Sequence, residues 1–157
     1  MIFATVGTQL AFPRLITALD AIAGSHGLEI IAQTCDPSPG TRHIETREHL
    51  APADFDALFA RAELVVAHAG IGTILTARTL AKPLLLMPRR VSLGEHRNDH
   101  QMATARFVAA FAGIRIAWTE SELEPRILEG DLRPPEPAET PERARLIARV
   151  REFALRD

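Results

Sequence analysis

The sequence predicts an α/β fold, a Rossmann-like parallel sheet with helices on both faces. Short apolar runs alternate with segments of helical periodicity along most of the chain, and this alternation is typical of parallel strands joined by crossover helices. The length of 157 residues suits one domain, and the 46% hydrophobic content can form one core. Prolines and glycines border several segments, as expected at the ends of helices and strands.

The first half of the chain contains four predicted strands. The apolar run 2–6 stops at Gly7 and predicts a buried strand. The next segment starts at Pro13, carries leucine and isoleucine at helical spacing and reaches Gly24, so it predicts a helix. The remaining elements of this half are a strand over 28–33, a short strand over 43–46, a helix over 52–62 and a strand over 63–68.

The second half continues this alternation and then changes character. It contains predicted helices over 71–81, 97–112 and 121–128, and predicted strands over 83–88 and 114–118. We therefore expect one globular unit over residues 1–130. Residues 131–157 predict a proline-rich connector and then a C-terminal amphipathic helix over about 141–156. The apolar stripe of that helix consists of Leu146, Ile147, Val150, Phe153 and Ala154.

Composition and charge exclude several classes of protein. The formal net charge of −2 and the pI near 6.3 argue against a general nucleic-acid binder, which is usually strongly basic. The single cysteine, Cys35, fits a reducing compartment. No apolar run approaches the roughly 20 residues that a membrane-spanning helix needs. We expect a cytoplasmic protein.

A glycine loop follows the fourth predicted strand. His68 ends that strand, and Gly70, Ile71, Gly72 and Thr73 lead into the next helix. Backbone N–H groups at the start of a helix attract anions, and glycines let an anion approach closely. With the Thr73 hydroxyl and a donor nitrogen of His68, this loop predicts a cradle for a diphosphate. The alternative is a tight turn that needs glycine for its geometry alone.

Two further loops follow strands of the same predicted sheet. The first, 6–12, contains Gly7 and Thr8, and it is either a ligand loop or an ordinary turn. The second, 88–101, is rich in hydrogen-bonding side chains, although a solvated surface loop would also explain them. Its polar residues include Arg89, Arg90, His96, Asn98, Asp99, His100 and Gln101. Since the carboxyl ends of parallel strands share one edge, all three loops should meet there. The spacing of the histidines lacks a third metal ligand, so we expect no metal.

The motifs in these loops resemble a known family. The segments "HAGIGTILTA", "AKPLLLMPRR" and "HRNDHQMATA" are similar to the C-terminal domain of glycosyltransferase family 28. That family includes MurG and the small catalytic subunit of the split eukaryotic GlcNAc transferase. "VGTQLAFPRLI" and "GEHRNDHQ" resemble the bacterial stand-alone subunits of PssE type. The likeness runs from residue 1 to about residue 118.

This resemblance implies the C-terminal half of a GT-B glycosyltransferase, with residues 1–130 as a half-domain that binds a UDP-sugar. It implies that His68 and the Gly70–Thr73 loop hold the diphosphate, that Gly7 and Thr8 face the same phosphates, and that His100 and Gln101 touch sugar hydroxyls. No cofactor is implied beyond the UDP-sugar donor. His68, with Arg89 or Arg90, would stabilise the charge on the leaving UDP.

The sequence departs from the family at Thr76. Related domains commonly carry a glutamate there, which grips the ribose hydroxyls. Threonine cannot accept two hydrogen bonds as a carboxylate does, and losing one charge-assisted bond costs about 1.5–3 kcal/mol. The ribose contact is therefore the doubtful part of the expected site.

The resemblance also implies partners. A GT-B enzyme binds its acceptor in the other half, so we expect a membrane-anchored acceptor-binding subunit that presents a lipid-linked saccharide. This chain would then sit at the inner face of the membrane through that partner. A homo-oligomer is also compatible with the sequence. Two other functions stay open, namely a non-catalytic sugar-nucleotide-binding scaffold and a GT-B type sugar-nucleotide epimerase.

Overall fold

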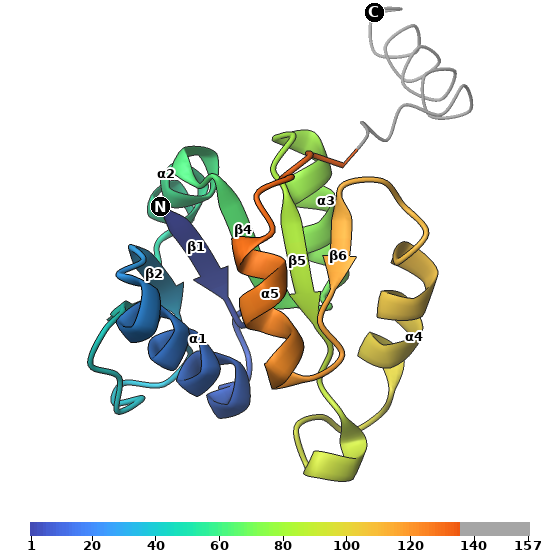
Figure 1. Ribbon diagram of the computed structural model, residues 1–157. Helices are drawn as coiled ribbons and strands as arrows, with labels where there is room; N and C mark the ends of the chain where they lie inside the picture. The colour runs from blue at the N-terminus through green and yellow to red at the C-terminus, as the bar shows by residue number, and fades with distance from the viewer. Residues whose placement is uncertain (136–157) are drawn as a thin grey trace, which may run out of the picture.

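A computed structural model describes residues 1–135 as a parallel sheet between two layers of helices (Figure 1). The predicted α/β fold is confirmed. The strands are β1 (Ile2–Thr5), β2 (Ile30–Gln33), β3 (Glu45–Arg47), β4 (Leu64–His68), β5 (Leu84–Met87) and β6 (Ile114–Ile116). The α-helices are α1 (Pro13–His26), α2 (Pro52–Arg61), α3 (Ile71–Thr79), α4 (His100–Val108) and α5 (Leu123–Leu128), and two short 3₁₀ turns are η1 (Val91–Leu93) and η2 (Glu120–Glu122).

The sheet has the strand order β3-β2-β1-β4-β5-β6, and every neighbouring pair is parallel. Ala4 of β1 lies between Ala32 of β2 and Val66 of β4, which fixes the central register. From β1, the chain first adds β2 and β3 on one side of the sheet and then adds β4, β5 and β6 on the other side. The loops after β1 and β4 therefore diverge at the centre of the carboxyl edge, where ligands bind in such sheets.

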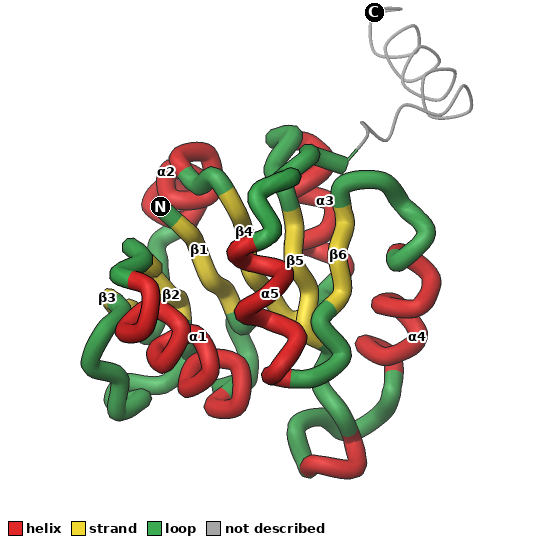
Figure 2. Tube along the Cα trace, viewed as in Figure 1, coloured by secondary structure: helices red, strands yellow, loops and turns green. Residues whose placement is uncertain are grey.

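Side chains of the strands alternate between two hydrophobic layers. Ala4, Val66 and Leu85 point to the layer that α1 and α5 cover, and Phe3 and Val65 point to the layer of α2, α3 and α4. Figure 2 shows α1 and α5 together on the near side of the sheet. Because both faces are covered there, every strand except the edge strand β3 is largely apolar, as the sequence indicated.

Several boundaries differ from the predicted ones. Helix α1 continues through Gly24 to His26 and stops at Gly27, whose φ of 62° suits glycine and whose N–H donates to the Ala23 carbonyl. Strand β3 starts at residue 45, because the N–H groups of residues 42–44 donate to the carboxylate of Asp20 instead of pairing in the sheet.

The helix predicted over 97–112 is shorter at both ends. Helix α4 covers only residues 100–108, and the preceding loop contains the turn η1. Residues 131–135 continue against the fold, with Leu132 packed on the core and the Pro134–Pro135 backbone against Gly113. The predicted domain division at residue 130 stays a prediction, and the predicted helix over 141–156 lies outside the described residues.

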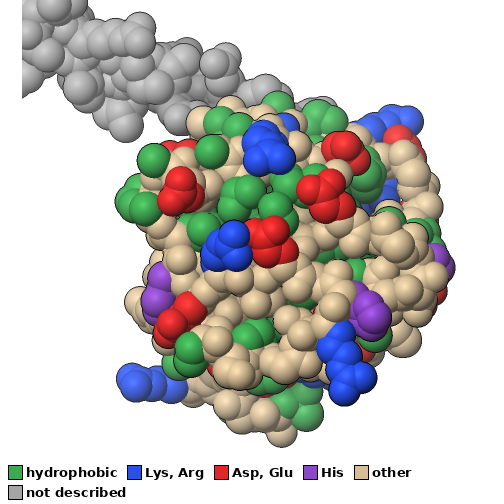
Figure 3. Space-filling model, turned by 90° about the vertical axis from the view of Figure 1, so that its left-hand side faces the viewer, with side chains coloured by type: hydrophobic (Ala, Val, Ile, Leu, Met, Phe, Trp, Pro, Cys, Tyr) green, Lys and Arg blue, Asp and Glu red, His purple; other side chains and the backbone are tan. Residues whose placement is uncertain are grey.

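Acidic and basic side chains are interspersed on the face shown in Figure 3. Within residues 1–135, no helix is long and apolar enough to cross a membrane.

Candidate functional site

A cavity of about 320 Å³ opens at the carboxyl edge of the sheet. It brings together the loops after β1, β4 and β5, which the sequence placed on one side. The lining residues are Thr5, Val6, Gly7, Thr8, Gln9, Leu10, Gln33, Phe55, His68, Gly70, Gly72, Thr73, Arg89, His96 and Gln101. Among the expected residues, the structure therefore brings together nine: Gly7, Thr8, His68, Gly70, Gly72, Thr73, Arg89, His96 and Gln101.

The imidazole of His68 lies between two glycines. A Cβ on Gly70 would stand 2.2 Å from His68 Nε2, and a Cβ on Gly7 would stand 2.9 Å from Cε1. Gly7 also has a φ of 87°, which few other residues adopt. Both glycines therefore make room for the histidine ring as well as shaping the two loops.

Burial, together with the charges of Arg89 and His96, lowers the pKa of His68 to about 4. A backbone group of Thr5 opposes this shift, yet His68 Nδ1 makes no hydrogen bond of normal geometry within the described residues. The ring is therefore neutral at pH 7. A neutral imidazole carries one N–H, so it can donate one hydrogen bond to a ligand without adding a positive charge.

The first turn of α3 offers backbone donors. Gly70 donates its N–H to the His68 carbonyl at 2.8 Å, so that group is occupied. The N–H groups of Ile71, Gly72 and Thr73 form no hydrogen bond within residues 1–135. A Cβ on Gly72 would meet nothing within 4 Å, so this glycine is not required by its own surroundings. Its missing side chain instead leaves space for a ligand at the helix start.

Arg89 is almost fully buried, with 2% of its surface exposed. Its guanidinium donates to the carbonyls of Val6, Leu10 and Ala11 at 3.1, 2.6 and 2.6 Å, and it stacks on the ring of Phe12 at 4.5 Å. Burial lowers the pKa of Arg89. The guanidinium donates its hydrogen bonds to carbonyls of the β1–α1 loop. Arg89 therefore fixes the shape of that loop and places a positive charge near the cavity.

Gln101 is held at the start of α4. Its Oε1 accepts the Arg89 backbone N–H at 3.2 Å, and its side-chain nitrogen forms no hydrogen bond within the described part of the chain. Because Oε1 is fixed, the amide nitrogen is the group left for a ligand in the cavity.

Comparison with known proteins decides the family. The model of the glycosyltransferase family 28 C-terminal domain matches residues 1–154. The chain belongs to this family. No protein of curated function matches the sequence.

Solved structures show the same fold as this family 28 domain. Acinetobacter baumannii MurG aligns with a TM-score of 0.58 and 19% identity over 80% of this chain and 38% of MurG. Methanocaldococcus jannaschii UDP-GlcNAc 2-epimerase, solved with UDP-GlcNAc and UDP, gives a TM-score of 0.63 and 14% identity over 97% of this chain and 45% of the epimerase. The chain thus spans less than half the length of these two proteins. The solution structure of ALG13 gives a TM-score of 0.57 and 19% identity over 92% of this chain and 93% of ALG13.

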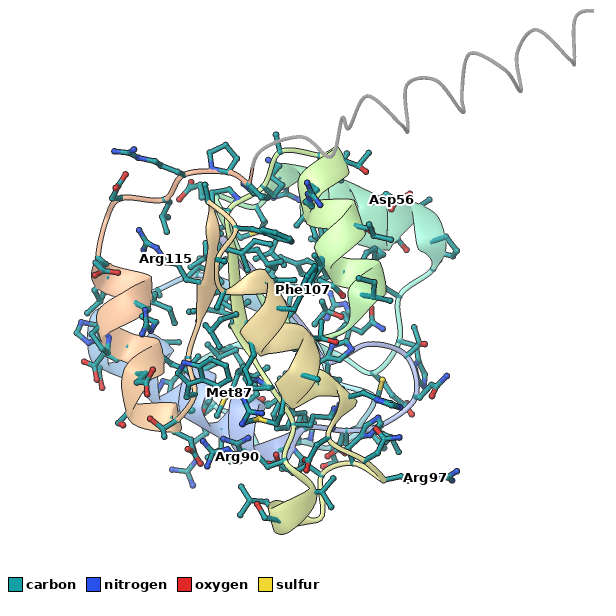
Figure 4. The ribbon with its side chains drawn as sticks, turned by 90° about the vertical axis from the view of Figure 1, so that its right-hand side faces the viewer. Asp56, Met87, Arg90, Arg97, Phe107 and Arg115 are labelled. Carbon is teal, nitrogen blue, oxygen red and sulfur yellow. The ribbon has the colours of Figure 1, made fainter. Side chains whose placement is uncertain are left out.

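Several expected residues of the family 28 domain lie outside the cavity. Arg90 donates to the Trp118 carbonyl, and Asn98, Asp99 and His100 are exposed on the approach to α4. The Thr76 hydroxyl donates back to the Gly72 carbonyl at 3.1 Å, and Ile71 faces solvent with 63% of its surface exposed. The structure therefore does not place these side chains with His68. Figure 4 shows Arg90 near the body of the fold and Arg97 projecting from the loop before α4.

The sequence did not reveal Gln33 or Phe55 as lining residues. Gln33 ends β2, is 2% exposed, and donates from Nε2 to the Gly7 carbonyl at 2.8 Å. Phe55 comes from α2, where its apolar spacing predicted only core packing, and its ring contacts Phe3 edge-on at 5.4 Å. The position of Gln33 at the end of a strand was the one signal that could have indicated its place. Within residues 1–135 no group of three histidines, cysteines or carboxylates could hold a metal ion.

Proposed function

We propose that this family 28 domain is the donor-binding catalytic subunit of a two-component glycosyltransferase, which moves a hexose from a UDP-sugar to a lipid-linked saccharide. The observation that carries this proposal is the cavity at the carboxyl edge. There the unpaired N–H groups of α3, the Thr73 hydroxyl and a neutral His68 converge. Such a set of donors fits a diphosphate.

The reaction requires stabilisation of the departing UDP. As the bond between the anomeric carbon and the UDP oxygen breaks, the electron pair stays on the diphosphate, and the acceptor oxygen forms the new bond. Preorganised N–H groups of α3 and the buried charge of Arg89 favour that developing negative charge. The amide nitrogen of Gln101 is available for a sugar hydroxyl, and Phe55 offers an apolar surface for the uracil ring.

The acceptor hydroxyl must also lose its proton to a base. Of the two histidines that line the cavity, His68 sits among the diphosphate donors. We therefore assign the base, and most of the acceptor site, to a membrane-anchored partner subunit. The fold of ALG13 aligns with this chain over 93% of the ALG13 chain, which supports a half-domain that can exist as a chain of its own. Exopolysaccharide or glycolipid synthesis at the inner face of the membrane is the setting that this arrangement suits.

Calorimetric titration tests the donor site. We expect UDP and at least one UDP-hexose to bind, and His68→Ala to weaken binding about tenfold, which corresponds to about one good hydrogen bond. The matched control is His49→Ala, since His49 is an exposed histidine outside the cavity. Equal UDP affinity in both variants would contradict the proposed role of His68, and no binding by the wild-type chain with its partner would contradict the donor site.

A second function has a specific observation in its favour. The fold of the UDP-GlcNAc 2-epimerase aligns with 97% of this chain. Incubating the purified chain with UDP-GlcNAc and no acceptor separates the two functions, because an epimerase would convert the sugar whereas a transferase subunit would leave it unchanged. If the chain with its partner binds UDP-sugars but transfers none, a non-catalytic sugar-nucleotide scaffold is the remaining function.

A further inference from the structure

A second cavity, of about 580 Å³, adjoins the first. It lies between the loop that leads into α1 and the loop that contains η1. Leu10 and His96 line both cavities, so the two spaces share a wall. A ligand in the second cavity would therefore lie next to a ligand in the first.

The walls of the second cavity are largely apolar. Leu10 and Leu93 are 47% and 55% exposed, although leucine is normally buried, and Ala11 and Pro13 continue the apolar lining. Exposed leucines around one hollow are typical of a site that an apolar group covers. The hollow is thus suited to a hydrocarbon chain.

The two arginines that line this cavity differ in their ion pairs, because Arg14 has carboxylate partners and Arg97 has none within residues 1–135. Arg14 donates two hydrogen bonds to the carboxylate of Glu95, at 2.5 and 2.8 Å, and lies 3.3 Å from Glu120. Glu95 also accepts the Arg90 backbone N–H at 2.8 Å. The Arg14–Glu95 pair is therefore neutralised and forms a fixed wall between the two loops.

Arg97 is the unpaired cation of this cavity. It forms no ion pair or hydrogen bond within residues 1–135, and its side chain projects from the loop (Figure 4). Arg14 is matched by the carboxylates of Glu95 and Glu120, so Arg97 is the cation at this rim that has no paired carboxylate within residues 1–135. An apolar hollow with a cationic rim fits an amphipathic anion.

We propose that the second cavity binds the lipid phosphate of the acceptor, with its hydrocarbon chain against Leu10 and Leu93 and its phosphate near Arg97. This inference rests on the proposed transferase function and deepens it. It assigns to this chain a part of the acceptor site, which the partner subunit would complete. The shared wall at His96 would bring the acceptor sugar toward the donor cavity.

Titration of the full chain with geranyl phosphate, below the concentration at which it forms micelles, tests this assignment. We expect geranyl phosphate to bind more tightly than geraniol or inorganic phosphate alone. Leu93→Ser should weaken binding about tenfold, since it removes a large apolar contact. Arg97→Gln should weaken it about threefold at low salt and less at high salt.

Leu128→Ser is the matched control. Leu128 is 46% exposed, which is close to the 55% of Leu93. It lies near Met1 and Glu63 at the opposite edge of the sheet. This variant should bind geranyl phosphate like the wild-type chain. Equal losses in Leu93→Ser and Leu128→Ser, or no loss in either, would overturn the assignment.

Competition with UDP separates this inference from the proposed function. Saturating UDP should leave geranyl phosphate bound, because the two ligands occupy different cavities. Displacement by UDP would place the lipid phosphate in the donor cavity and refute the second site. If UDP binds and geranyl phosphate does not, the lipid site alone fails. If the chain with its partner binds neither, the donor function fails as well.

Discussion

Gly70 and Gly72 are two residues apart and have opposite surroundings. A side chain at Gly70 would collide with the His68 ring at 2.2 Å, whereas one at Gly72 would enter open space at the mouth of the cavity. The same loop therefore contains one glycine that the fold requires and one that a ligand would require.

This contrast gives a paired prediction. Gly70→Ala should lower the free energy of unfolding by about 2 kcal/mol or more, because the half-buried His68 ring must move. Gly72→Ala should leave stability unchanged or raise it by about 0.5–1 kcal/mol, since alanine favours a helix, yet weaken UDP binding. Urea unfolding and calorimetry measure the two effects. A Gly72→Ala variant that binds UDP normally would contradict the cradle at α3.

His68 makes stability depend on pH. Its pKa of about 4 in the folded chain lies below the usual value near 6.5, so the unfolded chain binds more protons between these two values. Stability therefore falls as pH decreases from 6.5 to 4, by up to about 3 kcal/mol. Urea unfolding across this range should show a weaker pH dependence for His68→Gln than for the wild-type chain. His49→Gln is the control and should keep the wild-type slope; parallel slopes for all three would be the contrary result.

For single residues, the sequence predicted which side chains could bind a ligand better than it predicted where those side chains lie. His68 was predicted from its residue type and glycine neighbours and Gln101 from the family resemblance, and both line the cavity. Arg89 was expected to face the ligand, but its guanidinium binds carbonyls of a loop 78 to 83 residues away. Such a contact depends on the order of the strands in the sheet, where β4 lies between β1 and β5, and local spacing does not specify that order.

The β1–α1 loop is the element that depends most on one side chain. Arg89 bonds three of its carbonyls, and Gln33 and Cys35 both donate to the Gly7 carbonyl, at 2.8 and 3.1 Å. This loop forms one wall of each cavity. Its shape is therefore set largely by side chains at or just after the ends of β2 and β5, namely Gln33, Cys35 and Arg89.

Arg89→Met should leave those buried carbonyls without donors. We expect a loss of about 3 kcal/mol in the free energy of unfolding, together with weaker UDP binding. Arg61→Met is a suitable control, since Arg61 is exposed at the end of α2. Chemical denaturation measures both variants, and equal stability of the two would show that the carbonyls have other partners.

Element boundaries were predicted well where local signals act alone. Pro13 marked the start of α1 correctly, because proline suits the first turn of a helix. The predicted end of α1 was wrong, since Gly24 lies beside the ring of His43 and the helix continues past it. The predicted start of β3 was wrong, since Asp20 accepts hydrogen bonds from three backbone N–H groups of the preceding loop. Those are tertiary contacts, which override local propensity.

At the scale of the whole molecule, ligand binding should raise thermal stability. UDP at 100 times its Kd would add about 2.7 kcal/mol if it binds only the folded chain. For a chain of this length this corresponds to a rise in Tm of about 5–10 °C. Differential scanning fluorimetry with UDP and with uridine measures the effect, and uridine should give a smaller shift because it lacks the diphosphate. An unchanged Tm with UDP would contradict a preformed donor cavity.

The whole fold was the most predictable feature. Alternating apolar runs and helical segments determine a parallel sheet with covered faces, and the right-handed crossover rule leaves few topologies. The second cavity was not predictable, because it depends on how the η1 loop folds against α1 through the Arg14–Glu95 pair, two residues 81 positions apart.

The central place of β1 has a consequence for synthesis. β1 leaves the ribosome before both of its neighbours, and it pairs with β2 on one edge and with β4, which starts at Leu64, on the other. At about 5–20 residues per second, roughly 3–12 s pass between the emergence of β1 and of β4. During this interval one edge of an apolar strand has no partner in the nascent chain. A strand that is buried in the finished molecule is therefore exposed along one edge while the chain is being made.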